Sequence, residues 1–133
     1  MNAIELSNLS KFYGNQCGID SVSFTVKKGE IFGFIGPNGA GKSTTIRTLL
    51  GLLKATSGKA EIMGIDISNE GAMIREKIGY LPSEVDYYSE MSSKELLLYH
   101  AAMYKVVDVE NKIQELATYF QLELDRPIDD LSY

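Results

Sequence analysis

The chain has 133 residues, of which 44% are hydrophobic, and a formal net charge of −5. This size and composition fit one small globular domain with a buried core, and the acidic balance argues against DNA or RNA as the main ligand, because nucleic-acid binding normally needs clustered Lys and Arg. Cys17 is the only cysteine, which excludes an internal disulfide and a cysteine-based zinc site and predicts a small filler residue in a reducing cytosol.

The first part of the chain predicts strands. Residues 3–9 and 21–27 alternate apolar and polar side chains, which is the pattern of half-exposed strands. Between them, residues 11–15 contain two aromatics and a glycine and predict a loop. Residues 30–35 form a short apolar run bounded by glycine, which predicts a strand buried on both faces of a parallel sheet.

A glycine-rich stretch follows this run and fits the phosphate-binding pattern G-x-x-x-x-G-K-[ST]. Glycines let successive backbone N–H groups approach phosphate oxygens without a Cβ in the way. A helix predicted over residues 42–50 adds its N-terminal N–H donors and the positive end of its dipole. The predicted nucleotide-binding residues of this stretch are Gly36, Pro37, Asn38, Gly39, Ala40, Gly41, Lys42, Ser43 and Thr44.

Two side chains of the stretch have specific expected roles. Lys42 is expected to reach the β- and γ-phosphates, where its charge gives it a catalytic role, and the Ser43 hydroxyl is expected to bind Mg²⁺. The alternative is a glycine turn that happens to stand beside a lone lysine.

The rest of the chain predicts shorter elements and then helices. We expect a strand over residues 59–63, a helix over 69–77, a strand over 78–81 and a loop over 83–91.

Two helices are expected after this loop. The sequence from Ser92 to Glu95 has the S-x-x-E pattern of a capping box and starts the first helix. Asp108 is expected to cap the second, and its apolar stripe would consist of Val109, Ile113, Leu116 and Phe120.

Taken in order, these motifs resemble the ATP-binding subunit of an ABC transporter, most closely the bacterial drug and antibiotic export group. The resemblance runs from residues 9–14 through the phosphate loop to residues 131–133. It implies an α/β fold: a P-loop NTPase core with antiparallel N-terminal strands, followed by the start of a helical subdomain. The expected division is residues 1–91 for the core and 92–133 for the helical subdomain, with the domain incomplete at its signature motif.

The resemblance also implies roles outside the phosphate loop. Tyr13 occupies the position of the family's aromatic residue that stacks on adenine; otherwise it is simply an aromatic in a turn. Where the family has Gln or Glu beside Mg²⁺, this chain has Ser83 followed by Glu84. Either Ser83 acts through a water molecule, or Glu84 binds the metal directly, or both are solvated loop residues.

Partners are implied in the same way. The loop over residues 86–91 corresponds to one that faces a transmembrane permease in relatives, and Tyr87, Tyr88 and Met91 are the candidate contacts. A second ATP-binding subunit is expected to complete the site. The protein is then expected at the cytoplasmic side of the membrane, held there by its partner, since no apolar run approaches the roughly 20 residues of a membrane span.

The residues that complete catalysis in the family have no counterpart in this sequence. Leu131, Ser132 and Tyr133 resemble the start of the signature motif, but no apolar strand ending in Asp-Glu is present, and the only histidine, His100, falls within a predicted helix. Since phosphoryl transfer needs several groups at once, we expect the chain to bind Mg-ATP with negligible hydrolysis.

Three other functions remain as alternatives. A soluble ABC-type ATPase would act on ribosomes or DNA, which the acidic charge disfavours. A regulatory remnant would bind ATP without hydrolysing it. The third is a GTPase or small-molecule kinase. A GTPase would normally carry N-K-x-D, and the sequence over residues 111–114 lacks the aspartate.

Overall fold

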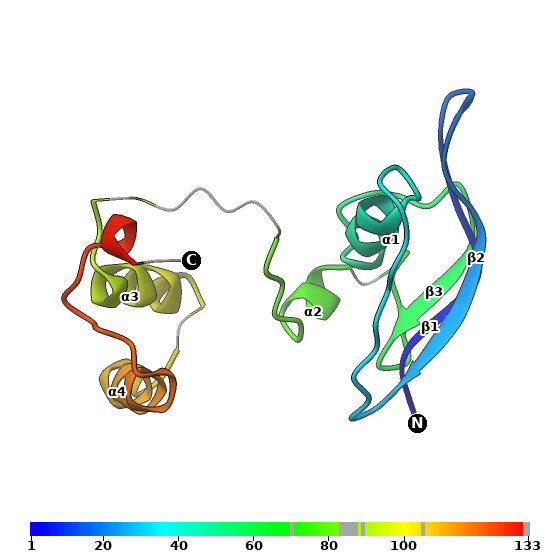
Figure 1. The fold of residues 1–133 in the computed structure, drawn as a ribbon. Helices are drawn as coiled ribbons and strands as arrows, with labels where there is room; N and C mark the ends of the chain where they lie inside the picture. The colour runs from blue at the N-terminus through cyan, green and yellow to red at the C-terminus, as the bar shows by residue number, and fades with distance from the viewer. Residues whose placement is uncertain (70, 83–87, 89, 105, 132–133) are drawn as a thin grey trace. The chain divides into compact units, whose positions relative to one another are not determined.

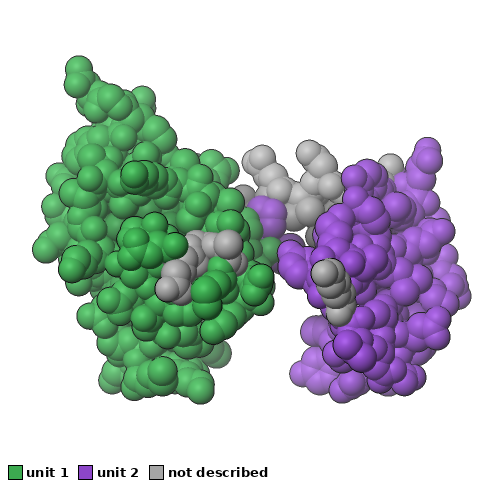
Figure 2. Space-filling view, turned by 180° about the vertical axis from the view of Figure 1, so that it is seen from behind, with its two compact units in different colours: residues 1–80 green, residues 81–133 purple. Residues whose placement is uncertain are grey.

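The computed structural model describes residues 1–69, 71–82, 88, 90–104 and 106–131. Two compact units divide the chain, one over residues 1–80 and the other over residues 81–133 (Figure 2). No helix in these described ranges combines the length and the apolar character needed to cross a membrane.

The first unit is built on a four-stranded antiparallel sheet. Its order is β2 (Gln16–Lys27), β1 (Asn2–Tyr13), β3 (Ser57–Ile62) and β4 (Ile65–Asp66). Strands were predicted where β1, β2 and β3 form, but β1 continues to Tyr13 through most of the expected loop. The turn is therefore only two residues long, and Gly14 begins it with a φ of 59°, a conformation that glycine adopts without steric cost.

Helix α1 (Lys42–Leu49) covers one face of this sheet (Figure 1). The buried core of the unit consists of Leu6, Leu9, Ile19, Leu49, Ala60, Ile62 and Ile74. Ile74 comes from the short helix α2 (Gly71–Arg75), which lies inside the predicted helix 69–77. The apolar residues of these strands and helices therefore pack into one core.

The strand predicted over residues 30–35 is wrong. The segment takes no part in the sheet, and Ile31 and Ile35 are 101% and 92% exposed. Phe32 and Phe34 instead pack on Phe24 of β2, with ring centroids 5.1 and 5.3 Å apart. The apolar composition of the segment is typical of a strand. A strand also needs a backbone partner, however, and this segment has none among the described residues.

The strand predicted over residues 78–81 is also wrong, for the same reason. These residues have no sheet partner in the described part of the chain. The antiparallel sheet is the one expected of the N-terminal strands, and the described residues add no parallel strand to it.

The second unit contains two helices, α3 (Ser93–Met103) and α4 (Val109–Phe120), and a short 3₁₀ helix, η1 (Ile128–Asp130). The predicted capping box is present: the Ser92 hydroxyl accepts from Glu95 N–H at 3.2 Å, and the Glu95 carboxylate accepts from Ser92 N–H at 2.8 Å. The chain after α4 returns to this end of α3, where Lys94 N–H donates to Leu124 O at 2.9 Å.

Two expectations for α4 need correction. Asp108 precedes the helix but adopts a left-handed conformation with a φ of 58°, and its side chain caps no backbone N–H. Instead it accepts a hydrogen bond from the Asn111 amide at 2.7 Å. The expected apolar stripe is only partly buried, because Leu116 and Phe120 are 47% and 69% exposed while Ile113 is buried.

Candidate functional site

The phosphate loop follows the segment over residues 30–35 and runs into α1, which begins at Lys42. It leaves the N-terminus of this helix open. Gly41 is the residue before α1, has a φ of 85° and offers no side-chain cap, and the first turn contains no acidic residue. The first N–H groups of a helix have no acceptor within it. The N-terminus of α1 therefore presents unpaired donors and the positive end of a dipole, which suits an anion.

Gly41 also lies directly against strand β2. A Cβ at this position would collide with Ile19 Cγ2 and with the backbone oxygen of Gly18. By contrast, a Cβ at Gly39 would meet nothing within 4 Å. The second glycine of the motif is thus needed for packing as well as for its backbone angle, and it holds the loop against the hairpin.

The Lys42 side chain folds back over the loop. Its Nζ donates to Gly36 O at 2.5 Å and to Pro37 O at 2.7 Å. An ammonium group has three N–H donors, so one remains for a phosphate oxygen. Ala40 N–H closes the loop by donating to Pro37 O at 3.2 Å.

The start of α1 is further fixed by two buried threonines. Thr45 Oγ1 donates to Gly41 O at 2.9 Å, and Thr48 Oγ1 donates to Thr44 O at 2.7 Å. Both side chains are fully buried, and these bonds satisfy their hydroxyl groups. The neighbouring Ser43 is exposed, and its hydroxyl remains accessible to a ligand.

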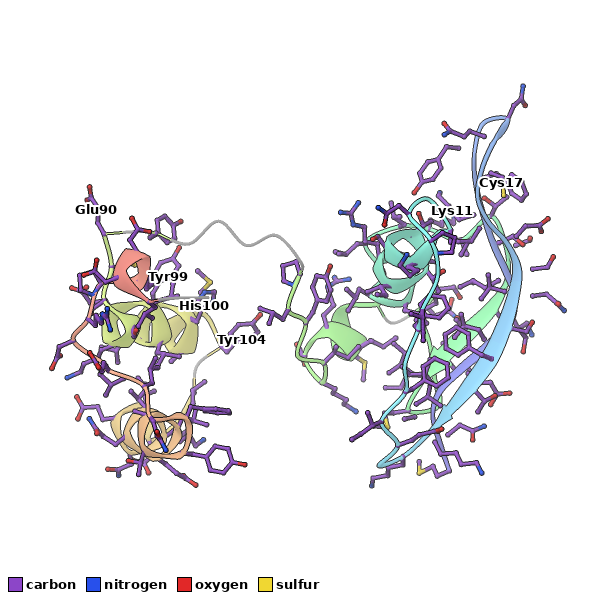
Figure 3. All side chains as sticks on the ribbon, viewed as in Figure 1. Lys11, Cys17, Glu90, Tyr99, His100 and Tyr104 are labelled. Carbon is purple, nitrogen blue, oxygen red and sulfur yellow. The ribbon has the colours of Figure 1, made fainter. Side chains whose placement is uncertain are left out.

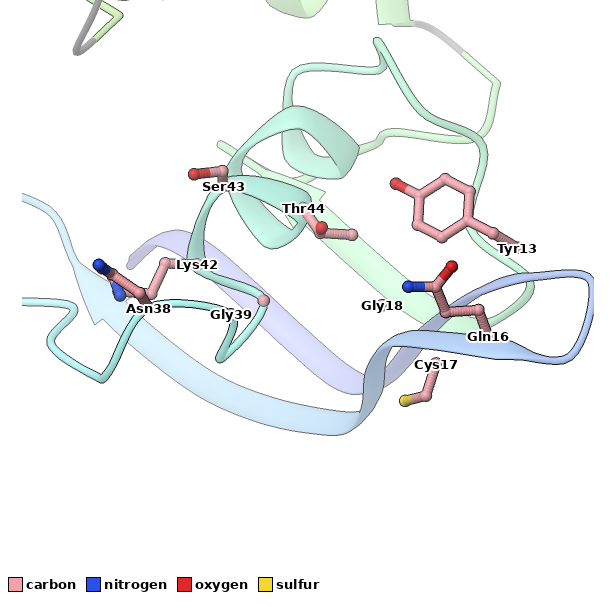
Figure 4. A pocket seen from close by; sticks show the side chains of 10 residues that line it. Tyr13, Gln16, Cys17, Gly18, Asn38, Gly39, Lys42, Ser43 and Thr44 are labelled. Carbon is pink, nitrogen blue, oxygen red and sulfur yellow. The ribbon is translucent and has the colours of Figure 1, made fainter.

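A cavity of about 570 Å³ lies between the β1–β2 hairpin and the phosphate loop (Figure 4). The loop and the first turn of α1 contribute Asn38, Gly39, Gly41, Lys42, Ser43 and Thr44. The hairpin contributes Tyr13, Gln16, Cys17 and Gly18. The predicted Gly36, Pro37 and Ala40 do not line the cavity, and they shape the loop around Lys42 instead.

Tyr13 stands at the hairpin end of this cavity and is 47% exposed. Its ring edge lies so close to Gly18 that a Cβ there would be 2.8 Å from Tyr13 Cε2. Lys11, on the same hairpin (Figure 3), places its Nζ 5.2 Å from the ring centroid, a cation–π distance. The ring is thus positioned from two sides within the hairpin.

Sequence reasoning missed the hairpin residues other than Tyr13. Cys17 was expected to be a small filler residue, but it is exposed and lines the cavity. Gln16 and Gly18 line it as well. The signal that would have identified Gln16 is strand register: β1 continues to Tyr13, which pairs directly with Gln16 across the turn.

The charge of the cavity wall is positive. Lys42 is the only charged residue among the ten that line the cavity, and none is acidic or a histidine. Across the described residues, no group of three or more His, Cys, Asp or Glu side chains could hold a metal ion. A metal here would need ligands from a bound molecule besides Ser43, as Mg²⁺ commonly takes from phosphates and water.

Of the remaining predicted site residues, the structure describes some and not others. Ser83, Glu84 and Tyr87 lie outside the described residues. Tyr88 is 58% exposed, and its ring packs edge-on against Tyr99 of α3 with centroids 5.8 Å apart. Met91 is half-buried, and its backbone oxygen accepts from Ile128 N–H at 3.0 Å.

Comparison with known proteins gives consistent matches. A family profile described as "ABC transporter" matches residues 19–133. The chain is 40% identical over 101 residues to the probable multidrug ABC transporter ATP-binding protein YbhF of Escherichia coli, covering 76% of this chain and 18% of the relative. It is 40% identical over 109 residues to the bacitracin transport ATP-binding protein BcrA of Bacillus licheniformis, covering 82% of this chain and 35% of the relative.

A solved ATP-binding subunit of an ABC transporter has a TM-score of 0.81 to this structure at 30% identity, covering 98% of this chain and 56% of the solved one. The chain therefore spans about a fifth to a third of the two curated relatives and about half of the solved chain. These matches confirm both the fold class and the resemblance carried by the motifs.

Proposed function

The chain belongs to the ABC transporter family of ATP-binding domains, and from this premise we propose that it binds Mg-ATP in the cavity between the hairpin and the phosphate loop. The phosphates lie at the N-terminus of α1, where backbone N–H groups and Lys42 bind them. The base stacks on Tyr13. Ser43 binds the magnesium ion that accompanies the nucleotide, and Ser83 or Glu84 supplies a further contact.

One observation carries this proposal: a single cavity has an anion site at one end and an aromatic ring at the other. The anion site combines the uncapped, acid-free N-terminus of α1 with the only charged side chain of the wall, Lys42. Stacking of a base on an aromatic ring contributes about 1–3 kcal/mol in nucleic-acid complexes. The two ends thus match the two chemically different halves of a nucleotide.

We propose that the chain binds the nucleotide without turning it over. Magnesium, when bound with ATP, neutralises charge on the phosphates. A general base for the attacking water is most often a carboxylate or an imidazole, and the described lining residues include neither. In this proposal the chain taken alone acts as an ATP-binding module.

In its assembly, we propose that the module couples ATP to substrate movement by a membrane partner. Tyr87, Tyr88 and Met91 are the proposed contacts with a permease, and a second ATP-binding subunit completes the site. Two observations support this: Tyr88 is exposed, and the matched relatives are named for multidrug and bacitracin transport. The protein is then peripheral to the membrane on its cytoplasmic side.

A thermal-shift measurement tests nucleotide binding. Mg-ATP at about a hundred times its dissociation constant would stabilise the folded chain by about 2.7 kcal/mol, and the shift should disappear in Lys42→Ala. Lys28→Ala, which changes an exposed lysine that does not line the cavity, should keep the full shift. Equal shifts in Lys42→Ala and wild type, or no shift in wild type, would refute the proposal.

A phosphate-release assay tests the absence of turnover. The purified 133-residue chain should release no inorganic phosphate from Mg-ATP above the level of the Lys42→Ala variant, because the described lining residues include no carboxylate or imidazole to act as a base. Sustained release that Lys42→Ala abolishes would show that the chain hydrolyses ATP by itself.

A further inference from the structure

We propose that Gln16 makes this site prefer ATP over GTP by hydrogen-bonding the edge of the base that carries N7. The inference rests on the proposed function, because it assumes that a nucleotide base stacks on Tyr13. It concerns a residue that neither the phosphate-binding motif nor the family aromatic includes.

The hairpin places Gln16 beside the base platform. Tyr13 and Gln16 are the last cross-strand pair of β1 and β2, and both line the cavity. Side chains of such a pair lie on the same face of the sheet, with Cβ atoms about 4.5–5.5 Å apart. Figure 4 shows the Gln16 amide and the Tyr13 ring on the same side of the hairpin. A base stacked on the ring therefore has its edge next to the amide.

The chemistry of the amide distinguishes the two purines. Glutamine offers an N–H₂ donor and a carbonyl acceptor side by side. Adenine presents N7 as an acceptor next to N6–H₂ as a donor, which matches both groups of the amide at once. Guanine presents two acceptors, N7 and O6, along the same edge, so one amide oxygen would face another oxygen. Adenine thus receives two hydrogen bonds where guanine receives one.

Among the hairpin residues that line the cavity, Gln16 is the one whose side chain presents a donor and an acceptor on separate atoms. Stacking on Tyr13 accepts any base, Gly18 has no side chain, and a thiol such as Cys17 is a weak hydrogen-bonding group. The Gln16 amide forms no hydrogen bond to the rest of the described chain and is exposed. It is therefore available to a ligand.

Isothermal titration of the 133-residue chain with Mg-ATP, Mg-GTP and inorganic tripolyphosphate tests the inference. One well-placed pair of hydrogen bonds discriminates by about 1–3 kcal/mol, so wild type should bind ATP about tenfold tighter than GTP. Gln16→Met keeps the length of the side chain but removes both polar groups. It should weaken ATP binding more than GTP binding, so that the preference for ATP disappears, and leave tripolyphosphate affinity unchanged.

A nucleotide analogue tests the proposed edge. In 7-deaza-ATP a carbon replaces N7 but N6–H₂ remains, so wild type should bind it more weakly than ATP but more tightly than Gln16→Met binds ATP. The Gln16→Met variant should not distinguish 7-deaza-ATP from ATP. Asn15→Ala changes the adjacent turn residue, which does not line the cavity, and should retain the wild-type preference.

The outcomes separate this inference from the proposed function. Wild type that binds ATP and GTP equally, or Gln16→Met that weakens ATP and GTP alike, overturns the role of Gln16 while nucleotide binding stands. Weaker tripolyphosphate binding in Gln16→Met also overturns it, because the change would then act on the whole site. Wild type that binds none of the three ligands overturns the proposed function and this inference together.

Discussion

Two glycines of the phosphate loop, Gly39 and Gly41, have nearly the same backbone angle but different surroundings. Their φ values are 82° and 85°, so a side chain at either position pays the cost of a left-handed conformation. Only at Gly41 would a Cβ also collide with strand β2. The pair therefore separates the backbone requirement of the motif from its packing requirement.

This difference can be measured by alanine substitution. Gly39→Ala should destabilise the chain by about 1–2 kcal/mol through its backbone angle alone. Gly41→Ala should cost a further ~1–3 kcal/mol, because the methyl group must displace Ile19 or the backbone at Gly18. Urea unfolding of both variants gives the two values. Equal destabilisation would contradict the docking of the loop on β2.

At the scale of a single element, the capping box of α3 makes the stability of this helix depend on pH. Hydrogen bonds from the Ser92 backbone N–H and then from its hydroxyl lower the pKa of Glu95. A carboxyl whose pKa is lower in the folded state contributes stability above its ordinary pKa of 4.5, and this contribution is lost as the pH falls through the folded-state pKa.

The variant Glu95→Gln tests this link because glutamine cannot titrate. Wild type should be more stable than Glu95→Gln at about pH 7 and should lose that advantage as the pH falls below 4.5 through the lowered pKa of Glu95. Ser92→Ala, which removes the other half of the box, should cost about 0.5–2 kcal/mol at neutral pH. Unfolding of the helical unit followed by circular dichroism measures each. An advantage that persists in acid would show that the carboxylate charge is not responsible.

On the scale of the whole molecule, the segment over residues 31–35 is the most exposed apolar stretch of the first unit. Ile31 and Ile35 point away from the aromatic cluster on β2 and are almost completely exposed. An extended apolar segment with an unpaired backbone is a template for pairing with another chain. The net charge of −5 is spread over the sequence, so it disfavours association of whole chains but places no charge on this segment.

The 133-residue chain should therefore self-associate as its concentration rises. The double variant Ile31→Lys with Ile35→Lys should remain monomeric over a wider range, because it places charge on the open segment. Leu52→Lys, at an isolated side chain that is 56% exposed, should behave like wild type. Light scattering across a concentration series compares the three, and similar association of both variants would rule out this segment as the cause.

The sequence by itself determined the features that depend on neighbouring residues. The phosphate loop, the start of α1 and the capping box of α3 form where the sequence predicts them, because each depends on residue types at fixed short spacings. The alternation of apolar and polar side chains likewise predicted strands where β1 and β2 form. These local features place Lys42 and Ser43 correctly at the N-terminus of α1.

The tertiary structure alone decided what depends on distant partners. Residues 30–35 and 78–81 have the composition of strands, yet pairing needs a second strand from elsewhere, and no periodicity reports whether one is present. Strand register likewise decided that the Gln16 side chain lines the cavity beside Tyr13, its cross-strand partner. A one-residue change in register would turn the same side chains to the other face.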